Sequence, residues 1–308
     1  MIINTGCRTD IPAYFSEWFF NRIKEGYVYV RNPYYQNQVT NYKLTPDVVD
    51  CLSFCTKNPG PMLNRIHEID KFNQFWFVTI TPYGKEIEPN VPDKEKIMED
   101  FKKLSDIIGA EKIGWRYDPI FITDKYTLKI HIENFEKMAS ELSGYTHDCI
   151  ISFIDLYEKT KRNFPGVKVV VEEERYTIAK EFVRIGKKYD IKIKTCVEGQ
   201  ELSKFDVDCS GCVTKPVIEK AIGVSLKIPQ KKSTRGGCNC LLGSDIGAYN
   251  TCGHGCVYCY ANYDQKTVIN NIKLHNPKSP FLIGGNLSGD VVKEAKQESF
   301  IDNQLTLF

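Results

Sequence analysis

The sequence predicts an α/β protein in the form of a full or partial (β/α) barrel. Strand-like apolar runs alternate with amphipathic segments of helical periodicity through the first two thirds of the 308-residue chain, and this alternation is typical of a parallel sheet. About six strand–helix units can be counted, without a glycine-rich phosphate loop or a dinucleotide-binding fingerprint between them. Hydrophobic residues make up 42% of the chain, which is enough to fill a large core.

Each element is assigned from its periodicity and its boundaries. Runs of apolar residues predict strands over 1–5, 50–54, 75–80, 112–116, 148–154 and 191–196. Apolar residues at helical spacing predict helices over 12–25, 62–69, 93–108, 128–142 and 176–189. Gly109 and Gly144 follow two of these helices and are suited to end them. We expect a barrel-like domain over 1–225, a segment that completes the barrel over 226–292, and a flexible tail over 293–308.

Polar side chains follow the predicted strands at the points where the strands end. The active site of a barrel forms at the carboxyl ends of its strands. We therefore expect these side chains to converge on one polar pocket rather than to belong to separate solvated loops. The residues expected to line this pocket and to orient a substrate are Arg8, Asp10, Lys57, Arg116, Asp118 and Glu198.

Charge and hydropathy exclude several classes of protein. The chain has 41 Lys and Arg against 39 Asp and Glu, a net charge of +2, which argues against a globally basic nucleic-acid binder but leaves room for a local basic patch. No apolar run approaches the ~20 residues of a membrane helix, and residues 1–8 lack the layout of a signal peptide. A cytoplasmic location without membrane association is therefore expected.

Cysteine usage carries the strongest chemical signal. In the reducing cytosol, 12 cysteines indicate metal binding, catalysis or burial rather than disulfides. Cys51, Cys55 and Cys149 lie in strand-like runs and are expected to be small buried hydrophobic residues. Eight of the twelve crowd into residues 196–259, which predicts a site in this part of the chain.

The sharpest motif is Cys252–Cys259, a Cys-x3-Cys-x2-Cys array. Thiolates are the protein ligands of iron–sulfur clusters, so three of them can hold three irons of a [4Fe–4S] cubane and leave the fourth iron open. Gly253 and Gly255 allow the loop to wrap a bulky cluster without Cβ clashes. The alternatives are a zinc site and three reduced cysteines in a turn.

The spacing of Cys252, Cys256 and Cys259, with the aromatic Tyr258 before the third cysteine, resembles the radical S-adenosylmethionine superfamily. The resemblance implies that S-adenosylmethionine binds the open iron, that a reductant such as ferredoxin or flavodoxin supplies an electron, and that a 5′-deoxyadenosyl radical abstracts hydrogen from a substrate. Residues 255–260 look particularly like the cluster loop of spore photoproduct lyase, a DNA-repair enzyme. A nucleic-acid lesion or modified base is the substrate that this likeness implies.

Nearly the whole chain also resembles one family of domains of unknown function grouped near the radical enzymes. The likeness runs through residues 8–13, 56–59, 81–84 and 115–120 and ends with 245–252 and the cysteine loop. This family often has a second basic residue in place of Cys7 and a Trp in place of Cys55, so neither cysteine is expected to be a shared ligand. The family offers no activity to carry over.

The position of the motif in the chain predicts a circular permutation. Radical enzymes usually place the cluster loop after the first barrel strand, whereas here it begins at residue 252. In a permuted barrel, residues 246–250 would form the first strand and 268–274 its helix, and 281–285 would resemble the next strand. Tyr258, Gly284 and Gly285 are then the residues expected to contact S-adenosylmethionine.

The remaining cysteines of residues 196–259 suggest a second metal site. Cys209 and Cys212 form a Cys-x2-Cys turn of the kind found at zinc and iron sites. A second iron–sulfur cluster or a zinc ion fits the same four ligands, with Cys209 as a substitute. The expected ligands are Cys196, Cys212, Cys238 and Cys240.

The last five residues, Gln304–Phe308, resemble the Gln-Leu-x-Leu-Phe peptide by which bacterial DNA polymerases and repair proteins bind the sliding clamp. An exposed peptide of this kind inserts Leu and Phe side chains into an apolar groove. The first interpretation is therefore a radical S-adenosylmethionine enzyme that acts on nucleic acid. The alternatives are a non-radical iron–sulfur protein for electron transfer or sensing and a zinc-stabilised adaptor for replication or repair.

Overall fold

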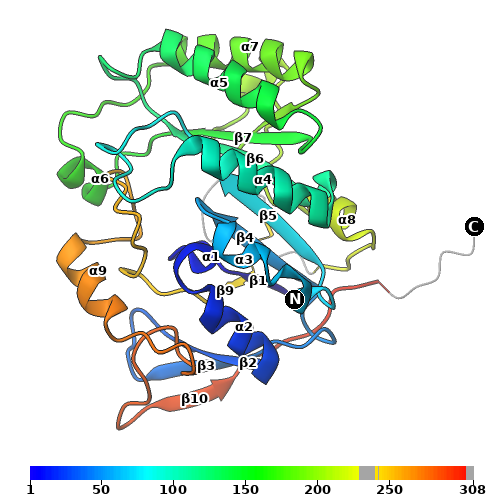
Figure 1. Cartoon of the computed structure of the whole chain (residues 1–308), viewed down its shortest axis with the longest axis vertical. Coiled ribbons are helices and arrows are strands. Elements are labelled where there is room, and N and C mark those ends of the chain that lie inside the picture. Colours follow the sequence, from blue (N-terminus) through cyan, green and yellow to red (C-terminus); the bar gives the residue numbers. More distant parts are fainter. Residues whose placement is uncertain (229–239, 242, 303–308) are drawn as a thin grey trace, which may run out of the picture.

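The protein is built on a seven-stranded parallel sheet (Figure 1), seen in a computed structural model that describes residues 1–228, 240–241 and 243–302. The strands lie in the order β8-β7-β6-β5-β4-β1-β9, and every neighbouring pair is parallel. Their bounds are β1 Ile2–Asn4, β4 Cys51–Thr56, β5 Gln74–Thr79, β6 Ile113–Ile120, β7 Asp148–Phe153, β8 Lys192–Thr195 and β9 Ser244–Asp245.

This arrangement confirms the predicted α/β class with a parallel sheet. β8 and β9 are the two edges of the sheet within the described residues, so the sheet is open there, and a closed ring is not formed. Each predicted strand of the first two thirds has a counterpart in the sheet, because buried parallel strands are continuous apolar runs that are easily recognised.

Long helices cover one face of the sheet, which we call the outer face. Leu52, Trp76 and Trp115 point to this face and pack in one continuous core with the helices. α5 begins and ends where the periodicity predicts, and Gly109 ends α4 with a positive φ of 96°. The helices that contribute to this core are α2 Ser16–Glu25, α4 Lys94–Ile108, α5 Leu128–Leu142 and α7 Glu172–Lys188.

The opposite, inner face of the sheet is covered by a shorter segment. Phe75, Phe77 and Ile150 pack there against residues around α8 (Lys215–Ile222), in a second hydrophobic cluster that includes Cys212 and Cys240. Strand alternation places Arg116 on this face, between the outward-facing Trp115 and Tyr117, and its guanidinium lies 5.3 Å from the centre of the Phe77 ring.

A small sheet lies beside the main one and joins distant parts of the chain. β2 (Tyr27–Arg31) and β3 (Gln38–Lys43) are antiparallel, and β10 (Val291–Glu294) adds to β3 in parallel. The first residues of the expected tail, 293 and 294, are thus paired in this strand. The Asp50 carboxylate also holds the chain further on, by accepting hydrogen bonds from Ser299 Oγ and Phe300 N.

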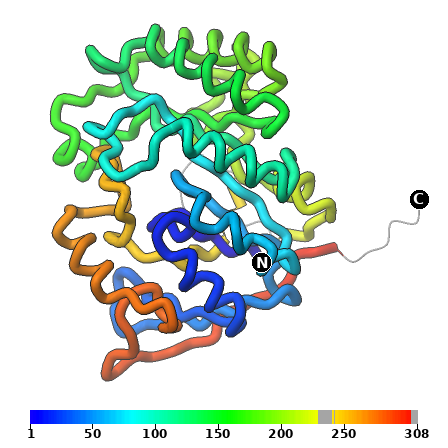
Figure 2. Tube along the Cα trace, in the orientation of Figure 1, coloured from blue at the N-terminus to red at the C-terminus, as the bar shows by residue number. Residues whose placement is uncertain are grey.

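Two elements of the predicted permuted segment differ in their bounds. In place of the strand expected over 246–250, the structure has the shorter β9 at Ser244–Asp245, just before this range. The helix expected over 268–274 corresponds to α9, Gln265–Ile272. The strand expected over 281–285 is wrong, because only Phe281 forms a bridge, with Tyr29 of the small sheet. Figure 2 shows that the segment after β9 runs beside the N-terminal residues.

The remaining helices are short and connect the larger elements. They are α1 Ile11–Tyr14, α3 Gly60–Leu63 and α6 Glu158–Asn163, with 3₁₀ turns at η1 Ile66–Ile69, η2 Ala110–Lys112 and η3 Glu201–Phe205.

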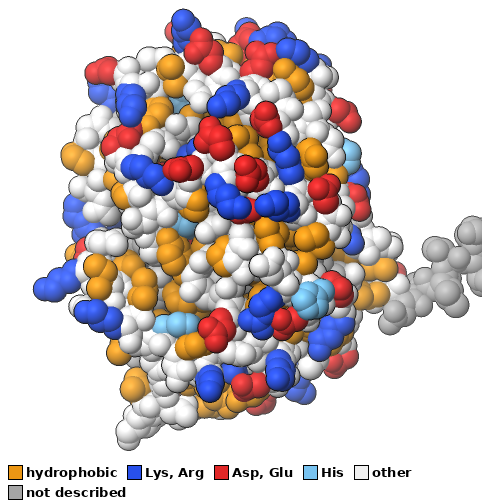
Figure 3. Space-filling view, in the orientation of Figure 1, with side chains coloured by type: hydrophobic (Ala, Val, Ile, Leu, Met, Phe, Trp, Pro, Cys, Tyr) orange, Lys and Arg blue, Asp and Glu red, His pale blue; other side chains and the backbone are white. Residues whose placement is uncertain are grey.

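The helical surface is mixed in charge. On the face in Figure 3, positive and negative side chains lie side by side over α4 and α5, in line with the net charge of +2. Among the helices of the described residues, none combines the length and the apolar character needed to cross a membrane.

Candidate functional site

The loop that contains Cys252, Cys256 and Cys259 leaves the main sheet directly after β9. Its backbone is held by the loop before α4: Asn90 N donates to His254 O at 3.0 Å, and Val257 N donates to Ile87 O at 3.0 Å. The Asn90 side chain adds a hydrogen bond to Gly253 O at 2.8 Å. The loop is therefore fixed to the connection between β5 and α4 rather than projecting into solvent.

Both glycines of the loop suit its geometry. A Cβ atom on Gly253 would lie 2.7 Å from Cε1 of Tyr14, closer than such contacts occur. Gly255 has a φ of 71°, in the left-handed region that L side chains rarely adopt. A side chain at position 253 would therefore require Tyr14 to shift, and one at position 255 would strain the backbone.

The three cysteines of the loop are half-buried and influence one another electrostatically. The Cys252 thiol lies within the electrostatic field of Cys256 and Cys259, and the Cys256 thiol lies within that of Cys259. Burial raises the pKa of Cys256 to about 12, against the opposing effect of the Lys57 cation. Burial likewise raises the pKa of Cys252, so metal binding here would release protons.

These features fit the donor set of an iron–sulfur cluster: three thiols on one short loop, with a cation beside them to offset negative charge. The described residues do not offer a site for a single metal ion. Within residues 1–228, 240–241 and 243–302, no group of three or more His, Cys, Asp or Glu side chains has an arrangement that could hold a metal ion.

Asp10 joins the start of the chain to the cysteine loop. Its Oδ2 accepts hydrogen bonds from Lys57 N and from His254 Nε2, both at 2.8 Å, and its Oδ1 accepts from Thr56 Oγ1 at 2.7 Å. The other ring nitrogen of His254 lies 3.1 Å from the Tyr14 hydroxyl. Asp10 also caps the N-terminus of α1. One buried carboxylate therefore holds together α1, the end of β4 at Thr56 and the cysteine loop at His254.

A second buried carboxylate, Glu88, lies on the other side of the loop. It accepts hydrogen bonds from Lys57 Nζ at 2.8 Å and from Thr81 Oγ1 at 2.9 Å, as well as from Lys94 and from the hydroxyl of Tyr258. Burial acts to raise the pKa of Glu88, but the two lysine cations outweigh it and hold the pKa at about 2. Glu88 is thus an anion that fixes Lys57 and Tyr258 beside the cysteines.

Four of the six predicted pocket residues gather around one thiol. Cys55, at the end of β4, lies within the electrostatic field of Arg116, Asp10, Asp118 and Lys57, and its pKa is raised chiefly by burial. Arg116 binds Asp118 through Nε at 3.1 Å and again through Nη2, and Ser152 donates to the same carboxylate. These four predicted residues therefore lie near the same thiol.

Arg8 and Glu198 have partners of their own. Arg8 Nε binds Asp245 Oδ1 of β9 at 2.7 Å, which ties the end of β1 to the edge strand. Glu198 accepts from Phe153 N at 2.9 Å and pairs with Arg175 of α7 at 3.0 Å. Burial raises the pKa of Glu198 to about 8, against the effect of Arg175.

Three of the four cysteines predicted for a second site do come together. Cys212 Sγ lies 3.5 Å from Cys196 Sγ and 3.3 Å from Cys240 Sγ, and Arg116 Nη1 lies 3.8 Å from Cys212 Sγ. Cys238 lies outside the described residues, and the Cys209 thiol instead donates to Val207 O. Hydrogen bonds from Cys212 and Cys240, with Arg116 nearby, lower the pKa of Cys196.

The predicted glycine pair has a different environment. Gly284 N donates to Leu274 O, and Gly285 O accepts from Arg31 of the small sheet. No atom lies within 4 Å of a Cβ built at either position, so a close approach within the described residues does not account for these glycines.

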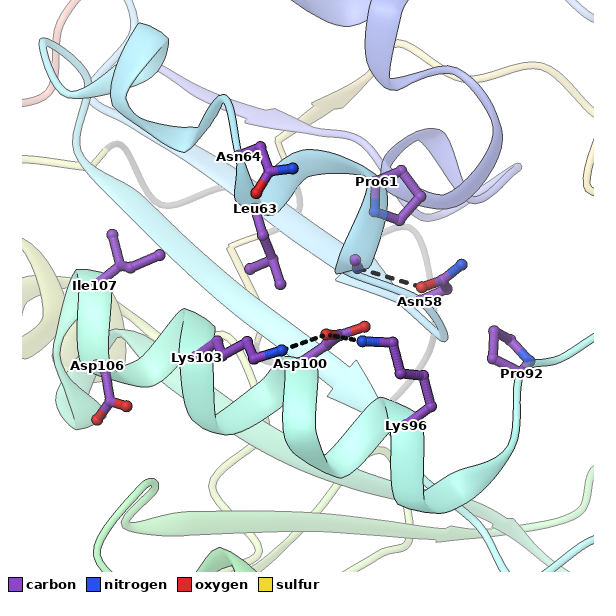
Figure 4. A pocket seen from close by; sticks show the side chains of 11 residues that line it. Asn58, Pro61, Leu63, Asn64, Pro92, Lys96, Asp100, Lys103, Asp106 and Ile107 are labelled. Atoms are coloured by element: carbon purple, nitrogen blue, oxygen red, sulfur yellow. Dashed lines mark hydrogen bonds and ion pairs between the residues drawn. The ribbon is translucent and has the colours of Figure 1, made fainter.

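Two hollows flank α4 on the outer side. One of about 700 Å³ lies between α3 and α4 (Figure 4), where Lys96 and Lys103 flank the buried Asp100 and Asn58 faces them. Another of about 330 Å³ includes Glu88 and Lys94. Neither is lined by the predicted Arg116 or Asp118, so the polar residues on the inner face do not line these hollows.

Sequence reasoning missed Glu88, His254 and Asn90. His254 lies inside the cysteine motif, and a histidine between two ligand cysteines was the available signal. Glu88 follows residues 81–84, which carry part of the family resemblance, but its partners Lys57 and Tyr258 are distant in sequence. Their roles therefore depend on the tertiary arrangement.

The comparison with known families gives one match that covers most of the chain. Residues 2–261 match the family described as Domain of unknown function (DUF1848), and the chain belongs to this family. The match includes the main sheet and the whole cysteine loop. No curated protein matches the chain.

Proposed function

We propose that the chain is an iron–sulfur enzyme in which Cys252, Cys256 and Cys259 hold a [4Fe–4S] cluster that leaves one iron open for S-adenosylmethionine. When bound, this pair supplies a 5′-deoxyadenosyl radical that abstracts hydrogen from a substrate. The observation that carries the proposal is the place of the cysteine loop, directly after an edge strand and at the end of the sheet where Asp10 and Lys57 also lie.

The strand order supports a permuted relationship to the radical enzymes. β9 lies next to β1, although Ser244 and its partner Ile3 are 241 positions apart in the sequence. Read in spatial order, the sheet begins with β9, the cysteine loop and α9 and then continues through β1 and β4 to β8. The loop thus follows the first strand in space, as the resemblance requires.

The protein's own residues would hold and shield the cluster. Asp10 positions the loop through His254, and Glu88 holds Lys57 where its charge offsets that of the Cys256 thiolate. Tyr258 packs beside Tyr83 and Phe121, which would exclude water from one side.

Arg116 and Asp118 are the proposed substrate-orienting pair on the inner face of the sheet. A guanidinium beside a carboxylate can recognise a polar, hydrogen-bonding group, and a nucleic-acid lesion or modified base is the proposed substrate class. The C-terminal peptide Gln304–Phe308, which lies outside the described residues, would bring the enzyme to DNA through the sliding clamp. A ferredoxin or flavodoxin would supply the electron.

The experiment is S-adenosylmethionine cleavage by protein purified without oxygen and treated with a strong reductant. We expect 5′-deoxyadenosine from the wild type and none from Cys256→Ala, whereas the matched Cys149→Ala, a buried cysteine on the outer face, should retain cleavage. Iron without cleavage would favour the non-radical iron–sulfur protein. A colourless protein that carries zinc would favour the adaptor and overturn both iron-based functions.

A further inference from the structure

The thiols of Cys196, Cys212 and Cys240 form a compact group on the inner face of the sheet, separate from the cysteine loop. Cys196 directly follows β8, Cys212 precedes α8, and Cys240 lies beside Cys212 because Leu241 N donates to Val213 O at 2.6 Å. Cys212 and Cys240 are buried and Cys196 is half-buried. Three segments distant in sequence thus bring three thiols to one point.

The sulfur spacing distinguishes between the kinds of centre that thiols form. The Sγ–Sγ distances of 3.3 and 3.5 Å exceed the ~2.05 Å of a disulfide, so the thiols are reduced. The thiolates of a cubane bind different irons and must stand farther apart than this. The three sulfur atoms thus lie at the spacing of neighbouring thiols, and no ion-holding group is found among the described residues.

We infer that Cys196, Cys212 and Cys240 form a redox-active thiol centre in which Cys196 reacts with a hydroperoxide and Cys212 resolves the product as a disulfide. Cys196 is the more accessible of the two. The guanidinium of Arg116 lies beside Cys212, with Nη1 3.8 Å from its sulfur. The two sulfur atoms need to approach by only about 1.5 Å to reach bonding distance.

The chemistry is balanced with the hydroperoxide as oxidant. The Cys196 thiolate attacks one peroxide oxygen, the O–O bond breaks, and the departing alkoxide takes up a proton, which leaves a sulfenic acid on Cys196. The Cys212 sulfur then attacks the Cys196 sulfur, and the hydroxyl group leaves as water with the Cys212 proton. Two electrons pass to the hydroperoxide, which ends as an alcohol and water.

Cys240 gives the centre a second position for the disulfide. Its sulfur lies 3.3 Å from that of Cys212, within reach for thiol–disulfide exchange that would release Cys196 and leave a Cys212–Cys240 bond. The first disulfide would fasten the start of α8 to the end of β8, and the second would fasten it to residues 240–241. Oxidation would therefore fix α8 in place over the inner face of the sheet.

The test uses the whole chain, purified without oxygen, treated with cumene hydroperoxide, alkylated and digested without reductant. We expect a Cys196–Cys212 or Cys212–Cys240 peptide pair by mass spectrometry, while the buried Cys51 and Cys149 in the same digest remain reduced. Cys212→Ser should instead retain a sulfenic acid on Cys196, detected with a sulfenic-acid-specific probe. Oxidation of Cys51 and Cys149 to the same extent, or a Cys196 that stays reduced in Cys212→Ser, would overturn the inference.

Metal analysis provides a second, independent readout. The variant with Cys196, Cys212 and Cys240 all replaced by Ser should bind as much iron and zinc per chain as the wild type. Loss of one metal ion per chain from this variant would assign the three thiols to a metal site and overturn the redox centre. Because this variant retains the Cys252–Cys259 loop, its result is separate from the fate of the proposed cluster.

Discussion

The Asp10 carboxylate accepts a hydrogen bond from Nε2 of His254 at 2.8 Å, across a sequence separation of 244 residues. Both side chains are buried. This contact fixes the middle of the cysteine loop to the carboxyl end of the main sheet, so the loop's shape depends on residues at the opposite end of the chain. Asp10 thereby links the fold to the proposed cluster site.

Replacing Asp10 with Asn is expected to destabilise the protein by about 2–3 kcal/mol, because an amide cannot accept from all of the donors that converge on the carboxylate. The free energy of unfolding from urea titration measures this, with Asp124→Asn, an exposed carboxylate, as the control. A change below about 0.5 kcal/mol, the usual range for surface substitutions, would show that the contact does not hold the loop.

Replacing Glu88 with Gln should destabilise the protein by about 3–5 kcal/mol, since the change leaves the Lys57 and Lys94 cations without their buried counter-ion. Thermal and urea unfolding would measure the loss. Glu86→Gln is a suitable control because Glu86 is exposed and pairs with Lys125 at the surface. Equal effects of the two changes would contradict the central place given to Glu88.

His131 predicts a pH dependence of stability. It is buried in α5, where its ring nitrogens lie 2.9 Å from the Tyr117 hydroxyl and from Phe121 O, and burial lowers its pKa from 6.5 to about 4. The unfolded chain therefore binds a proton that the folded protein does not between these values. The contribution of His131 to the free energy of unfolding should be complete above pH 6.5. The free energy of unfolding should fall by roughly 3 kcal/mol as the pH drops towards 4.

The measurement compares urea unfolding at several pH values for the wild type, His131→Gln and the exposed His147→Gln. The slope between pH 6.5 and 4 should decrease in His131→Gln and remain in His147→Gln. If the slope of His131→Gln equals that of the wild type, another group is responsible for it.

Clamp binding is expected to require Gln304–Phe308. A chain that ends at Asn303 should lose affinity for a purified bacterial sliding clamp, because the Leu and Phe anchors of the peptide are removed. Surface plasmon resonance with immobilised clamp measures this directly. Equal binding by the full and the shortened chain would rule out the peptide as the contact.

Much of the main sheet and its outer helices could be predicted because their signals are local. The periodicity of residues 128–142 alone sets the bounds of α5, and the apolar run of β5 is equally clear. The small sheet was not predictable in this way. Its strand β10 pairs with β3 across about 250 residues, and polar residues such as Gln38 and Asn41 interrupt the pattern of β3.

The candidate site also combines residues that local sequence signals predict with residues that they do not. Asp10 and Lys57 follow strands, and Arg116 and Asp118 lie within β6. A parallel sheet gathers such residues at one edge, so their convergence could be predicted. Glu88 and His254 act through partners that are distant in sequence, and no periodicity reports such pairs. The proximity of Cys196 and Cys212 to Cys240 likewise depends on the path of α8 over the inner face.

The most direct test of the central claim is the iron and sulfide content of protein purified without oxygen. We predict about four irons and four sulfides per chain in the wild type and in Cys149→Ala, with loss of the cluster in each of Cys252→Ala, Cys256→Ala and Cys259→Ala. A wild type without iron and sulfide, or full occupancy in all three loop variants, would contradict the assignment of the cluster to this loop.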